Sequence, residues 1–229
     1  MIKKRVVVIS FIVGIILLFV LLNQINQAQE TTKLEKLPNY TEIRGQININ
    51  EGINYDKQPS MGVNDAKVKV VMFADYKCPA CKKWDLNFLD QFKKDFVDTG
   101  KVKLYFMNFA FIDRDSIMAA SAGEAVAKQN LDLFWQFHRK VFEHQGDESK
   151  IWATPEYLLQ LAEGIEGIDT KQLEHDLKEH TYMLDVKEDF KIAGSLGVNG
   201  TPQFIVNDLL LPTSDYNDLA EAIEQEFAK

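Results

Sequence analysis

The feature that most constrains this chain is a pair of cysteines separated by two residues, in the tetrapeptide Cys78-Pro79-Ala80-Cys81. They are the only two cysteines among 229 residues, and they follow an apolar run at 68–74 that has the length of a buried strand. A disulfide that closes so small a loop restrains an unfolded chain very little, so a purely structural role explains it poorly. The spacing beside a strand–helix boundary instead indicates a thioredoxin-like redox centre.

The residues around the pair predict two thiols of unequal acidity. Pro79 suits the first position of a helix, which places Cys78 at the N-cap, near free backbone N–H groups and the positive end of the helix dipole. Both features favour a thiolate, and Lys77 adds a neighbouring cation. We therefore expect Cys78 to be the exposed attacking sulfur with a lowered pKa, and Cys81, one turn deeper, to be the resolving sulfur.

Two other interpretations of the cysteine pair stay open. Half of a zinc site is one, although a second cysteine pair is missing and the histidines do not show the spacing of a zinc finger. An inert structural disulfide is the other. The four histidines are His138, His144, His175 and His180.

The N-terminus predicts export to the outer side of a membrane. A basic start, Met1 to Arg5, precedes an almost unbroken apolar stretch at 6–22, which is the lower limit for a membrane-spanning helix. The positive flank stays inside, so the rest of the chain faces outward. Without a small-x-small cleavage site, an uncleaved anchor at 1–22 is favoured over a removed signal. The polar residues 23–57 are expected to form a partly flexible tether, with a short edge strand at 45–54.

The remaining residues suit one compact domain that can bury a proper core, since 46% of the chain is apolar. A net charge of −8 with scattered basic residues argues against nucleic acid as a partner. Apolar periodicity predicts strands at 68–73, 102–109 and 203–206, with 209–211 pairing back as a hairpin. Helices are expected at 82–97, 117–128, 131–144, 155–163, from 169, at 182–196 and at 215–227. His138, inside an aromatic stripe, is interpreted as a packed core histidine.

These elements describe an α/β domain in which strands flank an all-helical insertion. We place the first part of the sheet domain at 58–115, the helical insertion at 116–190 and the second part at 191–229. A strand–helix–strand unit surrounds the cysteines, and such units are right-handed and parallel.

Three segments together resemble the DsbA-type thiol–disulfide oxidoreductases, over residues 58–229. The resemblance is strongest to their membrane-anchored disulfide oxidases from Gram-positive bacteria. It implies a thioredoxin fold with an inserted helical domain, catalysis by Cys78 and Cys81, and a cis Thr201–Pro202 bond against the cysteines. Pro79, Ala80, Thr201 and Pro202 would then line the substrate site. The matching segments are Phe73-Ala74-Asp75-Tyr76-Lys77-Cys78-Pro79-Ala80-Cys81, Phe134-Trp135-Gln136-Phe137-His138 and Gly197-Val198-Asn199-Gly200-Thr201-Pro202-Gln203-Phe204.

The resemblance also raises two questions. Many members of the wider fold place a buried acid six residues before the first cysteine, as a proton acceptor for the deeper thiol; here that position is Met72, so Asp75 or Lys82, through water, would take its place. Some Gram-positive relatives bind calcium, and the matching oxygen ligands fall on Gln58, Glu124 and Asp189, with a backbone carbonyl near Met61. The alternative is that these carboxylates are solvated charges on helix faces.

The sequence thus predicts an extracytoplasmic enzyme that donates the Cys78–Cys81 disulfide to exported, reduced proteins. The chemistry needs no cofactor beyond this disulfide, and the resemblance implies reoxidation by a quinone-linked membrane partner of the DsbB type. Two rivals remain: an anchored thiol reductase or isomerase, as in cytochrome maturation, and an exported binding module with a structural disulfide.

Overall fold

The computed structural model describes residues 2–35 and 37–229, with side chains for 12–29, 31, 32 and 37–229. The chain divides into two compact units, Met1–Leu37 and Pro38–Lys229. The second unit begins well before residue 58. The segment 38–57, which we expected to belong to a tether, is therefore part of this unit.

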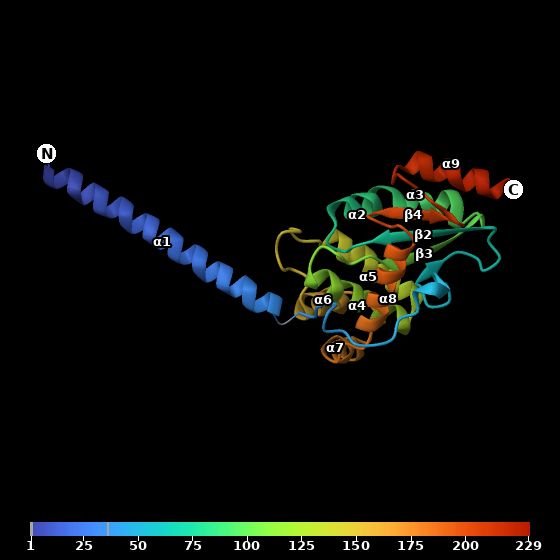
Figure 1. Ribbon diagram of the computed structural model, residues 1–229, viewed down its shortest axis with the longest axis horizontal. Coiled ribbons are helices and arrows are strands. Elements are labelled where there is room, and N and C mark those ends of the chain that lie inside the picture. Colours follow the sequence, from blue (N-terminus) through green and yellow to red (C-terminus); the bar gives the residue numbers. More distant parts are fainter. Residues whose placement is uncertain (1, 36) are drawn as a thin grey trace. The chain divides into compact units, whose positions relative to one another are not determined.

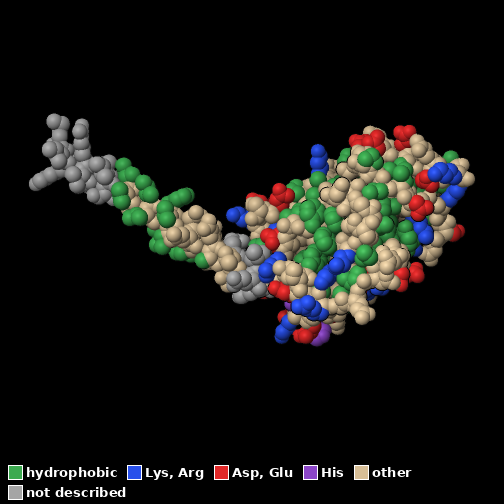
Figure 2. Space-filling model, in the orientation of Figure 1, with side chains coloured by type: hydrophobic (Ala, Val, Ile, Leu, Met, Phe, Trp, Pro, Cys, Tyr) green, Lys and Arg blue, Asp and Glu red, His purple; other side chains and the backbone are tan. Residues whose placement is uncertain are grey.

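Helix α1 (Ile2–Glu35) forms the first unit and extends well beyond the apolar stretch that the sequence marks. Its segment Ile12–Gln29 has a mean hydropathy of 1.6, and none of it is buried. Figure 2 shows hydrophobic and uncharged polar side chains along this segment. Among the described helices, α1 is the one long and apolar enough to cross a membrane, so it fits a single-pass anchor; a signal sequence would have the same properties. The basic side chains of Lys3 to Arg5 lie outside the described residues.

The second unit is built around a mixed sheet in the order β1-β3-β2-β4-β5 (Figure 1). Strands β2 (Val68–Ala74) and β3 (Val102–Asn108) are parallel, as the strand–helix–strand pattern predicts. Strand β4 (Gln203–Val206) pairs antiparallel with β2, and β5 (Leu209–Leu210) pairs antiparallel with β4. The two-residue strand β1 (Ser60–Met61) lies antiparallel at the other edge.

Helices cover both faces of this sheet (Figure 1). One face carries the helical stretch after β2, which consists of α2 (Pro79–Trp84), a π-helical segment at Asp85–Leu89, α3 (Asp90–Phe92) and a second π-helical segment at Lys93–Val97. Trp84 packs there against Phe204 of β4, with ring centroids 4.8 Å apart. Helix α9 (Tyr216–Phe227) covers the same face.

Helix α8 (Met183–Ser195) packs on the opposite face of the sheet. Between β3 and α8 the chain forms α4 (Arg114–Gln129), α5 (Leu131–Glu143), α6 (Pro155–Glu163) and α7 (Thr170–Lys178). This arrangement is the thioredoxin fold with added helices that the sequence predicts. Under α8 the core consists of Val71, Phe73, Tyr105, Met107, Phe109, Ile192, Ala193, Val198 and Ile205.

The structure differs from the sequence prediction at 45–54, where the predicted edge strand is absent. The backbone there forms a single 3-10 turn, Ile49–Glu51. The Asn48 side chain accepts a hydrogen bond from the Asn50 amide and donates one to Glu51, and Gly52 adopts a positive φ of 67°. Local side-chain capping and a turn glycine therefore prevail over the alternation of isoleucines.

Candidate active site

The two cysteines lie at the junction of β2 and α2. Cys78 is the N-cap of α2 and Pro79 takes the first helical position, as predicted. Pro79 and Ala80 are exposed, whereas Cys81 is fully buried in the first turn. Cys78 is 8% exposed, so the sulfur that we expected to be open reaches the surface only narrowly. Both cysteines are free thiols, and the structure therefore describes the dithiol form.

The two thiols differ strongly in acidity. The pKa of Cys78 is lowered from 9.0 to about 6, chiefly by a hydrogen bond from Cys81, with further hydrogen bonds from Thr201 and from the backbone N–H groups of Cys81 and Ala80. Burial opposes this shift. The pKa of Cys81 is raised well above its ordinary value by burial and by the neighbouring Cys78 sulfur. At neutral pH the charge therefore rests on Cys78, as the N-cap position predicts.

The loop before β4 brings Thr201 next to the Cys78 sulfur. The Thr201–Pro202 peptide bond is cis, which confirms the prediction. The Cys78 sulfur lies 3.3 Å from the Thr201 carbonyl oxygen, to which the protonated thiol donates a hydrogen bond. The Thr201 hydroxyl oxygen is buried and makes no hydrogen bond of standard geometry in the described part of the chain. Among the expected substrate-binding residues, Thr201 is thus in direct contact with Cys78. Pro79 and Ala80 follow Cys78 in helix α2.

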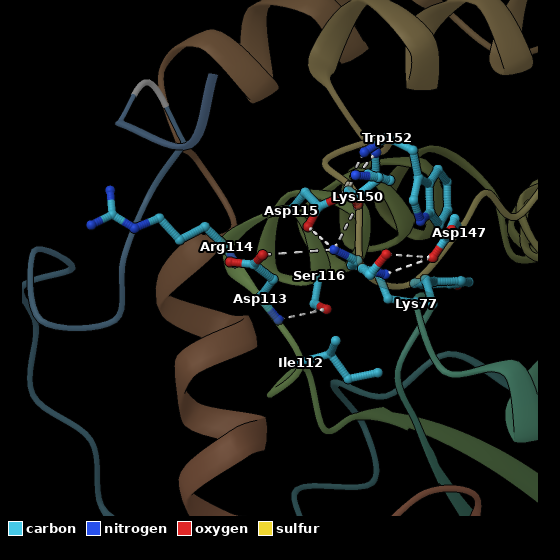
Figure 3. Close-up of polar contacts among 12 residues, drawn as sticks. Lys77, Ile112, Asp113, Arg114, Asp115, Ser116, Asp147, Lys150 and Trp152 are labelled. Atoms are coloured by element: carbon cyan, nitrogen blue, oxygen red, sulfur yellow. Dashed lines mark hydrogen bonds and ion pairs between the residues drawn. The ribbon is translucent and has the colours of Figure 1, made fainter. Parts of the chain in front are cut away.

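Lys77 does not act on Cys78 as the sequence suggests. Its side chain is fully buried, and its ammonium nitrogen donates to Asp115 Oδ1 at 2.6 Å and to the Lys150 carbonyl at 3.0 Å (Figure 3). The positive charge is therefore compensated by a buried carboxylate. Lys77 is not among the principal causes of the lowered Cys78 pKa, so the expected contribution of this cation is wrong.

The site lacks a buried acid at position 72, as the sequence indicates. Met72 is buried in β2 and is in register with Phe106 of β3 and Phe204 of β4. Asp75 is buried too, and its carboxylate accepts hydrogen bonds from the amides of Lys77, Phe111 and Ile112 at 2.8, 2.9 and 3.1 Å. Burial raises the pKa of Asp75, and these hydrogen bonds oppose the rise.

The backbone of Asp75 also touches the deeper thiol. Its amide N–H donates a hydrogen bond that lowers the pKa of Cys81, against the larger effect of burial. Lys82, the other candidate for the proton pathway, donates to the Glu143 carbonyl at 3.3 Å instead. The contact of Asp75 with Cys81 is thus made by its backbone N–H and not by its carboxylate, so it does not supply a proton acceptor for this thiol.

His138 is a packed core histidine, as interpreted from the sequence. It is fully buried, and its ring bonds Tyr76 Oη through Nδ1 at 3.0 Å and Asp85 Oδ2 through Nε2 at 2.8 Å. Sequence reasoning missed Gln145, whose side-chain amide donates to the carbonyl oxygens of Tyr76 at 2.7 Å and of Cys78 at 3.0 Å. Gln145 lies in the segment after α5, and nothing in its local sequence marks it.

The three expected calcium ligands are brought together on the α8 side of the sheet. Gln58, Glu124 and Asp189 are all buried and line one small cavity of about 10 Å³. Gln58 Nε2 donates to Asp189 Oδ1 at 2.9 Å, and Asn108 donates to Glu124 Oε1 at 2.8 Å. Met61, whose carbonyl we expected nearby, is not among the residues that line the cavity.

The donor set of this cavity fits calcium. Burial raises the pKa of Asp189 to about 7 and the pKa of Glu124 well above its ordinary range, so a cation held between them would favour their charged forms. The Gln58 side-chain oxygen is buried and has no hydrogen-bond partner among the residues whose side chains are described. Within residues 2–35 and 37–229 no group of three or more His, Cys, Asp or Glu side chains is arranged for a metal, so the amide oxygen is essential to the fit.

Comparisons with known proteins agree with this geometry. The thioredoxin family model matches residues 54–225. The probable disulfide bond formation protein D of Bacillus anthracis is 41% identical over 181 residues, which cover 79% of this chain and 83% of that protein. Disulfide bond formation protein D of Bacillus subtilis is 39% identical over 170 residues, or 74% of this chain and 77% of that protein. The crystal structure of oxidised BdbD from Bacillus subtilis superposes with a TM-score of 0.73 at 37% identity, over 78% of this chain and 97% of that one.

Proposed function

This chain belongs to the thioredoxin family and is a thiol–disulfide oxidoreductase of the BdbD and DsbA type, and we propose that it introduces disulfide bonds into exported proteins outside the cytoplasm. The observation that carries the proposal is the unequal acidity of the two thiols. A Cys78 sulfur that is stable as a thiolate is a good leaving group, and a disulfide with a good leaving group is readily donated to other thiols.

We propose the following exchange. A substrate thiolate attacks Cys78 Sγ of the disulfide form; the Cys78–Cys81 bond breaks, and Cys81 leaves and takes up a proton. A second substrate thiolate then attacks the substrate sulfur of the mixed disulfide, and Cys78 leaves as the thiolate. The substrate loses two electrons and gains a disulfide, and the enzyme is left as the dithiol. Thr201, Pro202, Pro79 and Ala80 border Cys78 and would contact the substrate chain.

Export and reoxidation are the second part of the proposal. Helix α1 supports an anchor, with the catalytic unit on the outer side of the cell membrane, where disulfides persist. The reduced pair would then be reoxidised by a quinone-linked membrane protein of the DsbB type. In this proposal residues 58–115 and 191–229 form the thioredoxin-like parts and 116–190 the helical insertion.

Calcium is proposed as a structural ion only. Gln58, Glu124 and Asp189 would hold it through oxygen atoms, which are the ligands that calcium prefers. The ion would compensate the charge of the two buried carboxylates. The cysteines need no cofactor for the exchange.

The proposal is tested by the direction of electron flow. The oxidised catalytic unit should oxidise a reduced, unfolded protein faster than it reduces a disulfide substrate, and its equilibrium with glutathione should favour the dithiol form. Cys78→Ser should lose both activities. If the equilibrium with glutathione favours the disulfide form instead, an anchored reductase is the better description, and an unreactive pair would indicate a structural disulfide.

A further inference from the structure

The residue before the proposed nucleophile is a lysine that never reaches solvent. Its ammonium group lies 2.6 Å from Asp115 Oδ1 and 3.8 Å from Asp113 Oδ2, and it donates to the carbonyl oxygen of Lys150 (Figure 3). Lys77 and Asp115 have no exposed side-chain surface at all. A buried charge of this kind persists only when a partner compensates it, so the state of Lys77 depends on Asp115.

Asp115 is itself held in one position. Its second oxygen, Oδ2, accepts hydrogen bonds from the amides of Trp152 at 3.0 Å and Ala153 at 3.2 Å. The residue lies in the first turn of α4, where the helix dipole favours a carboxylate. One side chain therefore connects the start of α4, the end of the α5–α6 loop (144–154) and the ammonium group of Lys77.

The α5–α6 loop is fastened to the cysteine segment at both ends. Near the beginning of the loop, the Gln145 side chain donates hydrogen bonds to the carbonyl oxygens of Tyr76 and Cys78. Near its end, Lys77 donates to the carbonyl oxygen of Lys150, and its partner Asp115 accepts from two loop amides. These contacts direct the Lys77 side chain toward the loop and α4. The buried ammonium group has three oxygens around it, from Asp115, Asp113 and Lys150.

We propose that Asp115 is a positioning residue, which neutralises Lys77 and fixes it in the α5–α6 loop so that no uncompensated ammonium charge acts on the Cys78 sulfur. The inference rests on the proposed function, because it gives Cys78 the role of the nucleophile. It adds a residue that lies 37 positions along the chain from Cys78 and does not touch the reacting atoms. Its role is to limit the acidity of the thiol, and thereby its oxidising strength.

Further charged groups surround Lys77 and enter the expected effect. Asp113, the N-cap of α4, lies 3.8 Å from the ammonium group, and Asp147 of the loop is close enough to feel its charge. Asp75 accepts a hydrogen bond from the Lys77 amide, and Lys150 supplies a carbonyl oxygen. The Cα atoms of Lys77 and Cys78 are about 3.8 Å apart, so the ammonium group and the sulfur are separated by at most roughly 13 Å. At an effective dielectric constant of about 20, one unit charge at this distance changes a pKa by about one unit.

The test is the pH at which the reduced protein forms its first thiolate, measured by ultraviolet absorbance in the protein with both cysteines present. Asp115→Asn leaves Lys77 uncompensated and should lower this midpoint, whereas Lys77→Met leaves Asp115 uncompensated and should raise it, each by up to about one pKa unit. The double variant removes both charges and should return the midpoint close to that of the wild type. Opposite shifts that cancel are the signature of charge compensation.

A merely structural role gives a different pattern. If Asp115 only fastens the loop, both single variants loosen the same contacts, their midpoints move in the same direction, and the double variant departs at least as far; that result would overturn the proposal. Glu224→Gln, which breaks the distant ion pair with Lys101, is the matched control and should leave the midpoint unchanged.

A second variant keeps the test valid if Asp115→Asn does not fold. Removing one partner of a buried pair is strongly destabilising, so Asp115→Asn could unfold the protein. Asp113 is partly exposed, and Asn is an equally good N-cap, so Asp113→Asn should fold and lower the midpoint by a smaller amount. An unchanged or raised midpoint in that variant would also contradict the proposal. A wild-type protein that exchanges no disulfides would instead refute the proposed function, whatever the midpoints.

Discussion

The lowered pKa of Cys78 predicts that the stability of the reduced protein depends on pH through this one side chain. The perturbation is Cys78→Ser, which keeps the size of the side chain and removes its ionisation in the accessible pH range. Cys81 does not interfere, because its pKa lies well above that of an ordinary thiol. Asp189 and Glu124 titrate in an unusual range, but they do so in both proteins, so their effect cancels in the comparison.

The sign and magnitude follow from the pKa in the folded and unfolded states. Folding lowers the pKa of Cys78 from 9.0 to about 6. A lowered pKa adds stability that is complete above the unfolded-state value and is lost as the pH falls through the folded-state value. Between pH values of about 5 and 8 the gain in the free energy of unfolding is about 2.5 kcal/mol. Because the Cys78 sulfur still reaches solvent, screening by water reduces this to roughly 1 to 2 kcal/mol.

The assay is urea unfolding of both proteins under reducing conditions at several pH values. The difference in unfolding free energy, wild type minus Cys78→Ser, should rise by roughly 1 to 2 kcal/mol between pH values of about 5 and 8. The rise should begin near the folded-state pKa of Cys78. A difference that stays constant from pH 5 to pH 8 would refute the argument. It would mean that the hydrogen bonds around Cys78 do not favour the thiolate over the thiol.

Two further expectations concern single groups. Thr201→Val removes a buried hydroxyl that lowers the pKa of both thiols, so the thiolate midpoint of Cys78 should rise and its reaction with disulfides should slow; Thr201→Ser should restore both, and equal behaviour of the two variants would exclude the hydroxyl. Calcium should raise the Tm more at pH 8 than at pH 6, because the pKa of Asp189 is about 7 and the ion binds the deprotonated carboxylate. Glu124→Gln should abolish this increase in Tm. An increase of the same size at both pH values would contradict the proposed calcium site.

The elements that could be predicted from the sequence are those with a dense local pattern. Strands β2 and β3 are rich in valine and aromatic residues because both of their faces are buried, and this composition can be recognised in each short segment by itself. The π-helical segments after α2 and the two-residue strand β1 have no such pattern. They depend on contacts with distant residues, so periodicity could not predict them.

In the candidate site, too, the features set by the local sequence could be predicted, and those set by distant contacts could not. The acidity of Cys78 relative to Cys81 was predictable, because the N-cap position and the depth of the next turn are local consequences of a Cys-Pro-x-Cys sequence. The effect of Lys77 was not, since it depends on where a long side chain points, and its partner Asp115 is 38 residues away. Gln145 is missed for the same reason, since the carbonyl oxygens it holds are 67 and 69 residues away.

Neutral groups, rather than a neighbouring cation, therefore account for the acidity of Cys78, and the register of the sheet is what brings them together. Phe73 of β2 is paired with Gln203 of β4, so the end of β2 and the start of β4 meet at one edge of the sheet. Five residues beyond Phe73 the chain reaches Cys78, and two residues before Gln203 lies Thr201. Its carbonyl oxygen is 3.3 Å from the Cys78 sulfur, and its hydroxyl is among the groups that lower the pKa of Cys78. A shift of one residue between these strands would turn the side chains of β4 to the other face and take Thr201 away from the sulfur. The antiparallel pairing of two buried strands is thus a condition for the lowered pKa, and through it for the proposed exchange.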